Sequence, residues 1–144
     1  MGADHRGYAL KERLKKMLQG AGREVVDCGT FSPQEAAYTE VAEKVANTVV
    51  AEHLGTGIVI DGGGGPSAIV GNKVNGIRAV ACPDVTSAKF ARAHVDGNLL
   101  CVGVGQVGDT VAEEIVATWL TTPFEGGRYG VRVREIEGVE KRQK

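Results

Sequence analysis

Hydrophobic positions along the chain follow two different periods. In some stretches apolar residues recur every three or four positions, which is the spacing of the buried face of an amphipathic helix. Between these stretches lie short, continuously apolar runs, which are typical of strands buried on both faces of a sheet. The predicted helices cover residues 8–19, 38–52, 67–72, 85–93 and 109–120. The predicted strands cover residues 24–29, 57–60, 76–82 and 98–104.

Helices that alternate with strands in this way predict a parallel sheet with helices on both faces, a three-layer, Rossmann-like α/β fold. The first strand–helix unit of this alternation is incomplete, because "MGADHRG" contains the loop of the unit but almost none of the strand that should precede it. That strand is either supplied otherwise or lies upstream of Met1, and with it the sheet has five strands. Residues 126–144 fall outside the alternation, and we expect them to form a C-terminal arm or helix that packs on a partner subunit. We expect all 144 residues to form one domain.

Charge and composition exclude several function classes. The 17 basic and 18 acidic residues are interspersed, the net charge is -1, and aromatic residues make up 5%. Without a basic stripe or aromatics for base stacking, nucleic acid is not an expected partner. No apolar run reaches the roughly 20 residues of a membrane span and no secretory signal is visible, so we expect a cytoplasmic protein without a membrane partner. Cys28, Cys82 and Cys101 lack metal-ligand spacing, so we expect reduced, buried thiols and no metal site.

The stretch "GIVIDGGGGPSAIVGNK" runs from a predicted strand through four glycines into a predicted helix. In a doubly wound sheet, ligands bind at the carboxyl ends of the strands where the strand order reverses. That crevice would bring Asp4 and His5 opposite Asp61. Consecutive glycines let backbone N–H groups approach a ligand closely, and a following helix favours a phosphate or an enediolate oxygen. The alternative is that the glycines only make a tight turn. The candidate cradle consists of Gly62, Gly63, Gly64 and Gly65.

A second glycine motif, "GVGQVG" at residues 103–108, matches the dinucleotide pattern G-x-G-x-x-G. It lies in the last strand–helix unit, however, and no later strand can carry the acid that binds a ribose. In the first glycine loop, Ser67 stands where that pattern needs its third glycine, although Asp84 is placed like the ribose acid. The lysine of a P-loop is absent, because Asn72 follows the glycine directly. Nucleotide binding is therefore only a minor alternative for this chain.

Histidines and arginines supply further candidates. His5 and His94 each follow the end of an apparent element, and either one taken alone is also explained as a hydrogen-bonded loop residue. Arg128 and Arg132 are four residues apart, so on a helix they project from one face and can clamp a phosphate. A solvated helix face is the alternative for these two arginines.

Taken together, "GADHRGYALKERL", "VVDCGT", "GIVIDGGGG", "NKVNGIRAV", "SAKFARAH", "NLLCVG" and "FEGGRYGVRV" resemble the family of ribose-5-phosphate isomerase B and the galactose-6-phosphate isomerase subunits. The resemblance runs nearly end to end. It implies a flavodoxin-like α/β domain that forms a homodimer or a tetramer, with active sites shared between subunits. It also implies that aldose and ketose phosphates are interconverted through an enediolate, without a metal or an organic cofactor.

The resemblance implies roles for individual residues. His94 would assist ring opening and Asp61 would be the candidate base. Arg128 and Arg132 would bind the phosphate of the sugar across the dimer. The remaining residues of the implied substrate site are Asp4, His5, Tyr38, the glycines 62–65 and Asp96.

Several positions depart from the family pattern. Asp61 takes the place of the usual catalytic cysteine, and Ser67 stands where some members use a glutamate as base. With an aspartate at this position, the chain also resembles the A subunit of galactose-6-phosphate isomerase, which works beside a cysteine-bearing paralogous subunit. Two hypotheses follow: an isomerase with Asp61 as base, or a sugar-phosphate-binding partner protein without its own base. The other departures are Ala37, Thr39, Gly63, Val95, Gly105 and Tyr129.

Overall fold

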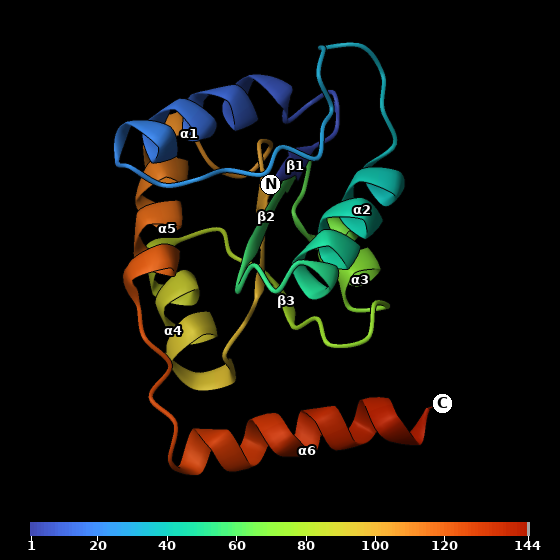
Figure 1. Cartoon of the computed structure of the whole chain (residues 1–144). Coiled ribbons are helices and arrows are strands. Elements are labelled where there is room, and N and C mark those ends of the chain that lie inside the picture. The colour runs from blue at the N-terminus through green and yellow to red at the C-terminus, as the bar shows by residue number, and fades with distance from the viewer. Residues whose placement is uncertain (144) are drawn as a thin grey trace.

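A four-stranded parallel sheet with helices on both faces forms the body of the molecule (Figure 1). The computed structural model describes residues 1–143. The strands are β1 (Gly2–Ala3), β2 (Gly57–Asp61), β3 (Ala79–Ala81) and β4 (Leu99–Gly103), in the order β1-β2-β4-β3. All three neighbouring pairs run parallel. The predicted three-layer α/β architecture is therefore confirmed.

Six helices accompany the sheet, and five of them lie close to the predicted positions. Alternate residues of β2 face opposite layers: Ile58 and Ile60 pack with the apolar faces of α1, α4 and α5, whereas Val59 packs with α2 and α3. Figure 1 shows these two helical layers on the two sides of the sheet. The helices are α1 (Tyr8–Gly20), α2 (Tyr38–Ala51), α3 (Gly65–Gly71), α4 (Val85–Val95), α5 (Asp109–Thr121) and α6 (Arg128–Arg142).

The prediction of five strands is wrong, because residues 24–29 do not form a strand. The segment still runs beside β1: Cys28 N donates to Met1 O at 2.8 Å, and Ala3 N donates to Gly29 O at 2.8 Å. Gly29 has a φ of 98°, which takes the backbone out of the extended region. With only two residues in β1, the ladder ends before a strand is established.

The flavodoxin-like strand order is also wrong in one respect. That order would place β3 next to β2, but β4 lies between them. All five residues of β4 are buried, whereas Val80 and Ala81 of β3 are only partly buried. A strand that is apolar on both faces suits the centre of the sheet, and the short β3 suits its edge. The chain order still reverses between β1 and β2, where the ligand crevice is predicted, because residues 28–30 run along the side of β1 that faces away from β2.

The C-terminal residues form the long helix α6, which lies apart from the two helical layers in Figure 1 and contacts α4. Val133 is its buried residue, while Ile136 and Val139 are 44% and 50% exposed. The helix is therefore only lightly held by its own chain.

A buried lysine joins α1 to the segment that follows it. Lys11 is fully buried, and its Nζ lies 2.7 Å from Asp27 Oδ1 and 3.3 Å from Glu12 Oε1. Burial alone would raise the pKa of Asp27, but hydrogen bonds from Lys11, Lys15 and the Gly29 N–H lower it to about 2. Asp27 thus stabilises the fold in its charged form.

Replacement of Asp27 by Asn is expected to lower the free energy of unfolding by about 3 kcal/mol, because it leaves a buried lysine poorly paired. The folded-state pKa of Asp27 lies below its unfolded value, so its contribution is complete above about pH 4 and is lost as the pH falls toward 2. Urea denaturation between pH 7 and 2 measures both effects, and this acid-dependent loss should be absent from Asp27→Asn. Glu135→Gln, which breaks an exposed ion pair with Arg132, is the control and should change stability by less than about 1 kcal/mol. Equal stability of the two variants at pH 7 would contradict this account.

Candidate functional site

Asp61 lies at the carboxyl end of β2 and begins the glycine loop. Its side chain is 1% exposed. Oδ1 accepts a hydrogen bond from the Gly64 N–H, and Oδ2 accepts from Ser67 N at 3.0 Å and from Ser67 Oγ at 2.5 Å. A carboxylate has about four acceptor positions, so three are used within the chain and one on Oδ1 is left. Asp61 holds the loop in shape whether or not it also takes a proton.

Asp4 lies beside Asp61, because Ala3 of β1 pairs with Ile60 of β2. Asp4 is 5% exposed, and its Oδ1 accepts the N–H groups of Arg6 and Gly7 at 3.0 Å each. The carboxylate therefore closes the turn into α1. The sequence-based expectation that Asp4 and Asp61 meet at one edge of the sheet is met by this register.

His5 and Tyr38 come from the segments around the same edge. His5 Nδ1 lies 3.3 Å from both the N and the O atom of Ala36, just before α2. This contact uses Nδ1 and leaves Nε2 for another partner. Tyr38, the first residue of α2, is 39% exposed.

His94 and the arginines of α6 form a second cluster. The His94 ring stacks on Phe90 and on Tyr129, with ring centroids 4.9 Å and 4.1 Å apart. Arg128 donates from Nη2 to the Tyr129 hydroxyl at 2.9 Å, and Arg132 Nη1 pairs with Glu135 at 2.7 Å. A cavity of about 390 Å³ lies against this start of α6. The predicted phosphate clamp is thus joined to His94 through an aromatic stack.

Asp96 ends α4 in the left-handed region, with φ 48°. Its carboxylate pairs with Arg92 Nη1 at 2.9 Å and with Arg78 Nη2 at 3.3 Å. The structure therefore engages Asp96 with two arginines of its own chain, as a helix end.

One chain does not bring the two clusters together. Residues 95–98 lead into β4 at the amino edge of the sheet, where Gly57 N donates to Asn98 O at 2.9 Å. Asp61 lies at the other end of β2, four residues after Gly57, which is about 13 Å at the rise of a strand. In Figure 1, β1 lies near the top of the view, and the start of α6 lies at the bottom beside α4. Asp61 and His94 therefore face different ends of the molecule.

Arg6 was not singled out by the sequence pattern, although it directly follows Asp4 and His5. It is exposed, and its guanidinium lies against the glycine loop: a Cβ built on Gly62 would come within 2.9 Å of Arg6 Cζ. The only signal in the sequence was its place in "GADHRG". Ser67 stood out as a departure, but its hydrogen bonds to Asp61 could not be read from spacing.

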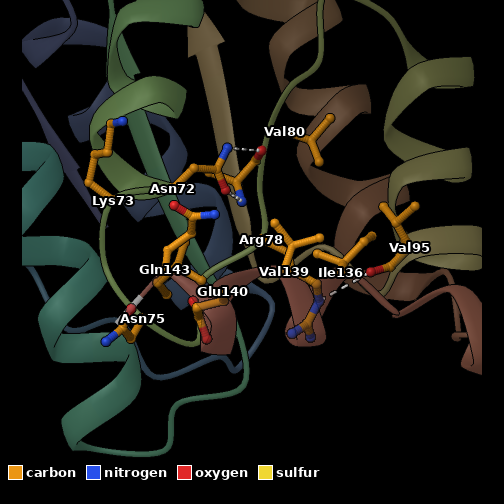
Figure 2. Close-up of a pocket in the computed structure, with 12 residues that line it drawn as sticks. Asn72, Lys73, Asn75, Arg78, Val80, Val95, Ile136, Val139, Glu140 and Gln143 are labelled. Atoms are coloured by element: carbon orange, nitrogen blue, oxygen red, sulfur yellow. Dashed lines mark hydrogen bonds between the residues drawn. The ribbon is translucent and has the colours of Figure 1, made fainter. Parts of the chain in front are cut away.

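None of the predicted site residues lines a cavity of about 790 Å³. It separates α6, with Ile136 and Val139, from the edge strand β3 (Figure 2). On the opposite wall the Asn72 amide bonds to both the N and the O atom of Ala79, at 2.8 and 3.0 Å, and so covers part of the sheet edge. This groove has apolar and polar walls from elements far apart in sequence.

The three cysteines are free and buried, as predicted. Burial raises the pKa of Cys82 to about 11. Burial, with the nearby Asp61 carboxylate, also raises the pKa of Cys101. Neither thiol is suited to act as a nucleophile or base near neutral pH. Within residues 1–143, no cluster of three His, Cys, Asp or Glu side chains could hold a metal ion, and no helix is long and apolar enough to cross a membrane.

Comparisons with known proteins agree on one family. The family model described as Ribose/Galactose Isomerase matches residues 1–136. Ribose-5-phosphate isomerase B of Escherichia coli is 40% identical over 142 residues, which is 99% of this chain and 95% of that protein. D-erythrulose-4-phosphate isomerase of Pectobacterium atrosepticum is 34% identical over 146 residues, covering 100% and 95% of the two chains.

A solved structure gives the same result. Ribose-5-phosphate isomerase B of Clostridium thermocellum superimposes with a TM-score of 0.96 at 40% identity, over 99% of this chain and 97% of that chain. The relatives are matched over nearly their whole lengths, with the glycine loop and the histidine–arginine cluster inside the matched region. The chain belongs to the ribose/galactose isomerase family.

Proposed function

We propose that this protein interconverts ribose 5-phosphate and ribulose 5-phosphate through an enediolate. Aldose–ketose isomerisation of a sugar phosphate follows from membership of the family, and the pentose is suggested by the relatives named for it. The observation that carries the proposal is the position of Asp61 and its glycine loop at the carboxyl end of β2. The chain order reverses there, because residues 28–30 run along the other side of β1, and a parallel sheet binds its ligands at such a point.

In the proposed reaction, Asp61 removes the proton from C2 of the open-chain aldose, and the electron pair moves to form the C1–C2 double bond of the enediolate. The carbonyl oxygen on C1 takes up the negative charge in this step. The proton then returns to C1 and the hydroxyl proton of C2 passes to O1, so that C2 becomes the carbonyl carbon of the ketose and no atoms are lost or gained. The free acceptor position on Oδ1 of Asp61 would take the proton. A carboxylate is a competent base for this kind of proton transfer, as in triosephosphate isomerase.

The glycine loop is proposed to stabilise the enediolate oxygen. In the described part of the chain, the N–H groups of Gly63 and Gly65 donate to no protein acceptor. A Cβ built on Gly63 would meet only Pro66 Cδ, at 3.6 Å, and one built on Gly65 would meet nothing within 4 Å. Backbone donors in such open positions can reach a developing negative charge without rearrangement.

We propose that the active site is completed by a second copy of the chain. The partner copy would contribute His94, to assist ring opening, together with Arg128 and Arg132 as the phosphate clamp. Support comes from the separation of the two clusters by the length of β2 within one chain. A symmetric dimer would form two such shared sites. The lightly held helix α6, with exposed Ile136 and Val139, is the proposed dimer arm, in a homodimer or a tetramer.

The hypothesis of a partner protein without its own base gains no support, since the relatives described above are named as isomerases in their own right. We also propose a cytoplasmic location, on the ground that the three cysteines are free and buried.

Purified protein is expected to convert ribose 5-phosphate to ribulose 5-phosphate with a higher kcat/KM than it shows for erythrulose 4-phosphate or a hexose 6-phosphate. A coupled assay with each sugar, with and without EDTA, measures this, and EDTA should leave the rate unchanged. Tight binding of ribose 5-phosphate without turnover would favour a partner protein that lacks its own base. Preference for the tetrose phosphate would overturn the assigned substrate but not the reaction class.

A further inference from the structure

Arg6 forms part of the wall around the glycine loop, on the same chain as Asp61. A Cβ at Gly62 would lie 2.9 Å from Arg6 Cζ, and a Cβ at Gly105 would lie 3.9 Å from Arg6 Nη2. Gly105 itself is tied to the loop, because its N–H donates to Gly62 O at 2.9 Å. The guanidinium thus lies over Gly62 and Gly105, in space that a larger residue at either position would occupy.

The guanidinium has no protein partner among residues 1–143. Arg13, Arg78, Arg92 and Arg132 each lie within 4.0 Å of a carboxylate, but no such ion pair involves Arg6. Its side chain also donates no hydrogen bond to a described residue. An exposed arginine held against a substrate loop, with all five N–H donors unused, is arranged to receive an anion.

We propose that Arg6 binds the phosphate group of the sugar phosphate, from the chain that supplies the glycine loop. This inference rests on the proposed function. The reacting carbons must approach Asp61, which is 1% exposed, whereas Arg6 is exposed at the rim of the same loop. With the reacting carbons at Asp61, the end of the substrate nearest Arg6 is the phosphate group, which stays negatively charged throughout the reaction. A planar guanidinium can form two parallel hydrogen bonds to phosphate oxygens.

The phosphate therefore receives cations from both copies of the chain. Arg6 is contributed with the loop, and Arg128 and Arg132 are contributed by the partner copy. Loss of an arginine from either chain would therefore weaken binding of the phosphate group.

Arg6→Gln is expected to raise both the KM for ribose 5-phosphate and the inhibition constant of inorganic phosphate by about 10- to 100-fold. The value of kcat should stay within about 3-fold, because Arg6 does not touch the reacting carbons. Arg6→Lys should recover part of the loss, since it keeps the charge but not the planar fork. Lys16→Gln is the matched control, because it removes one exposed positive charge from α1 and should change neither constant.

Unchanged KM and unchanged phosphate inhibition in Arg6→Gln would overturn the proposal. A fall in kcat without a change in KM would also overturn it, since Arg6 would then act at the reacting carbons. If the wild-type protein turns over no sugar phosphate, the proposed function fails. Calorimetry with ribose 5-phosphate then decides for Arg6: binding lost in Arg6→Gln supports the inference, and binding retained refutes it.

Discussion

Two inactive variants, Gly63→Phe and Arg132→Ala, are expected to regain about a quarter of wild-type activity when they are unfolded, mixed in equal amounts and refolded together. Random pairing makes half of the dimers mixed. In each mixed dimer one site combines the intact loop of one chain with the intact Arg132 of the other, while the second site carries both defects. Steady-state turnover of ribose 5-phosphate, with the two chains tagged differently, measures the recovery.

Each variant alone should lose activity by at least about 100-fold, for separate reasons. A side chain at Gly63 has room, since its Cβ would meet only Pro66 Cδ at 3.6 Å, but a phenyl ring there blocks the loop. Arg132 is 72% exposed and pairs with Glu135, so its loss removes a phosphate contact without disturbing the fold. The variants refolded separately and mixed afterwards are the control. Mixed dimers that form but stay inactive would show that each site belongs to one chain.

Much of the fold could be predicted from periodicity. The apolar faces of α1 and α5 and the buried runs of β2 and β4 appear directly in the sequence. The segment 24–29 failed as a strand because its neighbour β1 has two residues and Gly29 leaves the extended region. The apolar pattern of a segment does not show how long the strand beside it will be. The order β1-β2-β4-β3 likewise depends on which strand is buried on both faces.

Only part of the candidate site could be predicted from the sequence. Asp4 and Asp61 meet because strand ends in a parallel sheet share an edge, which is a general rule. The separation of His94 from Asp61 could be expected only from the resemblance to a family with shared sites. Arg6 was missed because its place depends on Gly62 and Gly105, which are far apart in sequence and side by side in the fold. Such a contact leaves no periodic or motif signal.

Asp61→Asn is expected to reduce kcat by at least about 1000-fold if Asp61 is the base, and to lower the free energy of unfolding by about 2 kcal/mol. The asparagine can still accept the Gly64 N–H through Oδ1. Its amide nitrogen would face the N–H of Ser67 and would leave that buried donor without an acceptor. Loss of activity could therefore reflect either missing chemistry or a disturbed loop.

Ser67→Ala separates the two explanations, because it weakens the same loop and keeps the carboxylate. It removes the hydroxyl hydrogen bond to Asp61 Oδ2 and leaves the bonds from the N–H groups of Gly64 and Ser67. We expect a stability loss of about 1 kcal/mol and a kcat within about 10-fold of wild type. Denaturation and single-turnover kinetics on both variants give the comparison. If kcat falls in step with stability in both, Asp61 serves only to hold the loop, and another group must take the proton. A large fall confined to Asp61→Asn assigns the proton transfer to this carboxylate, because the loop would be weakened in both proteins and the base removed in only one.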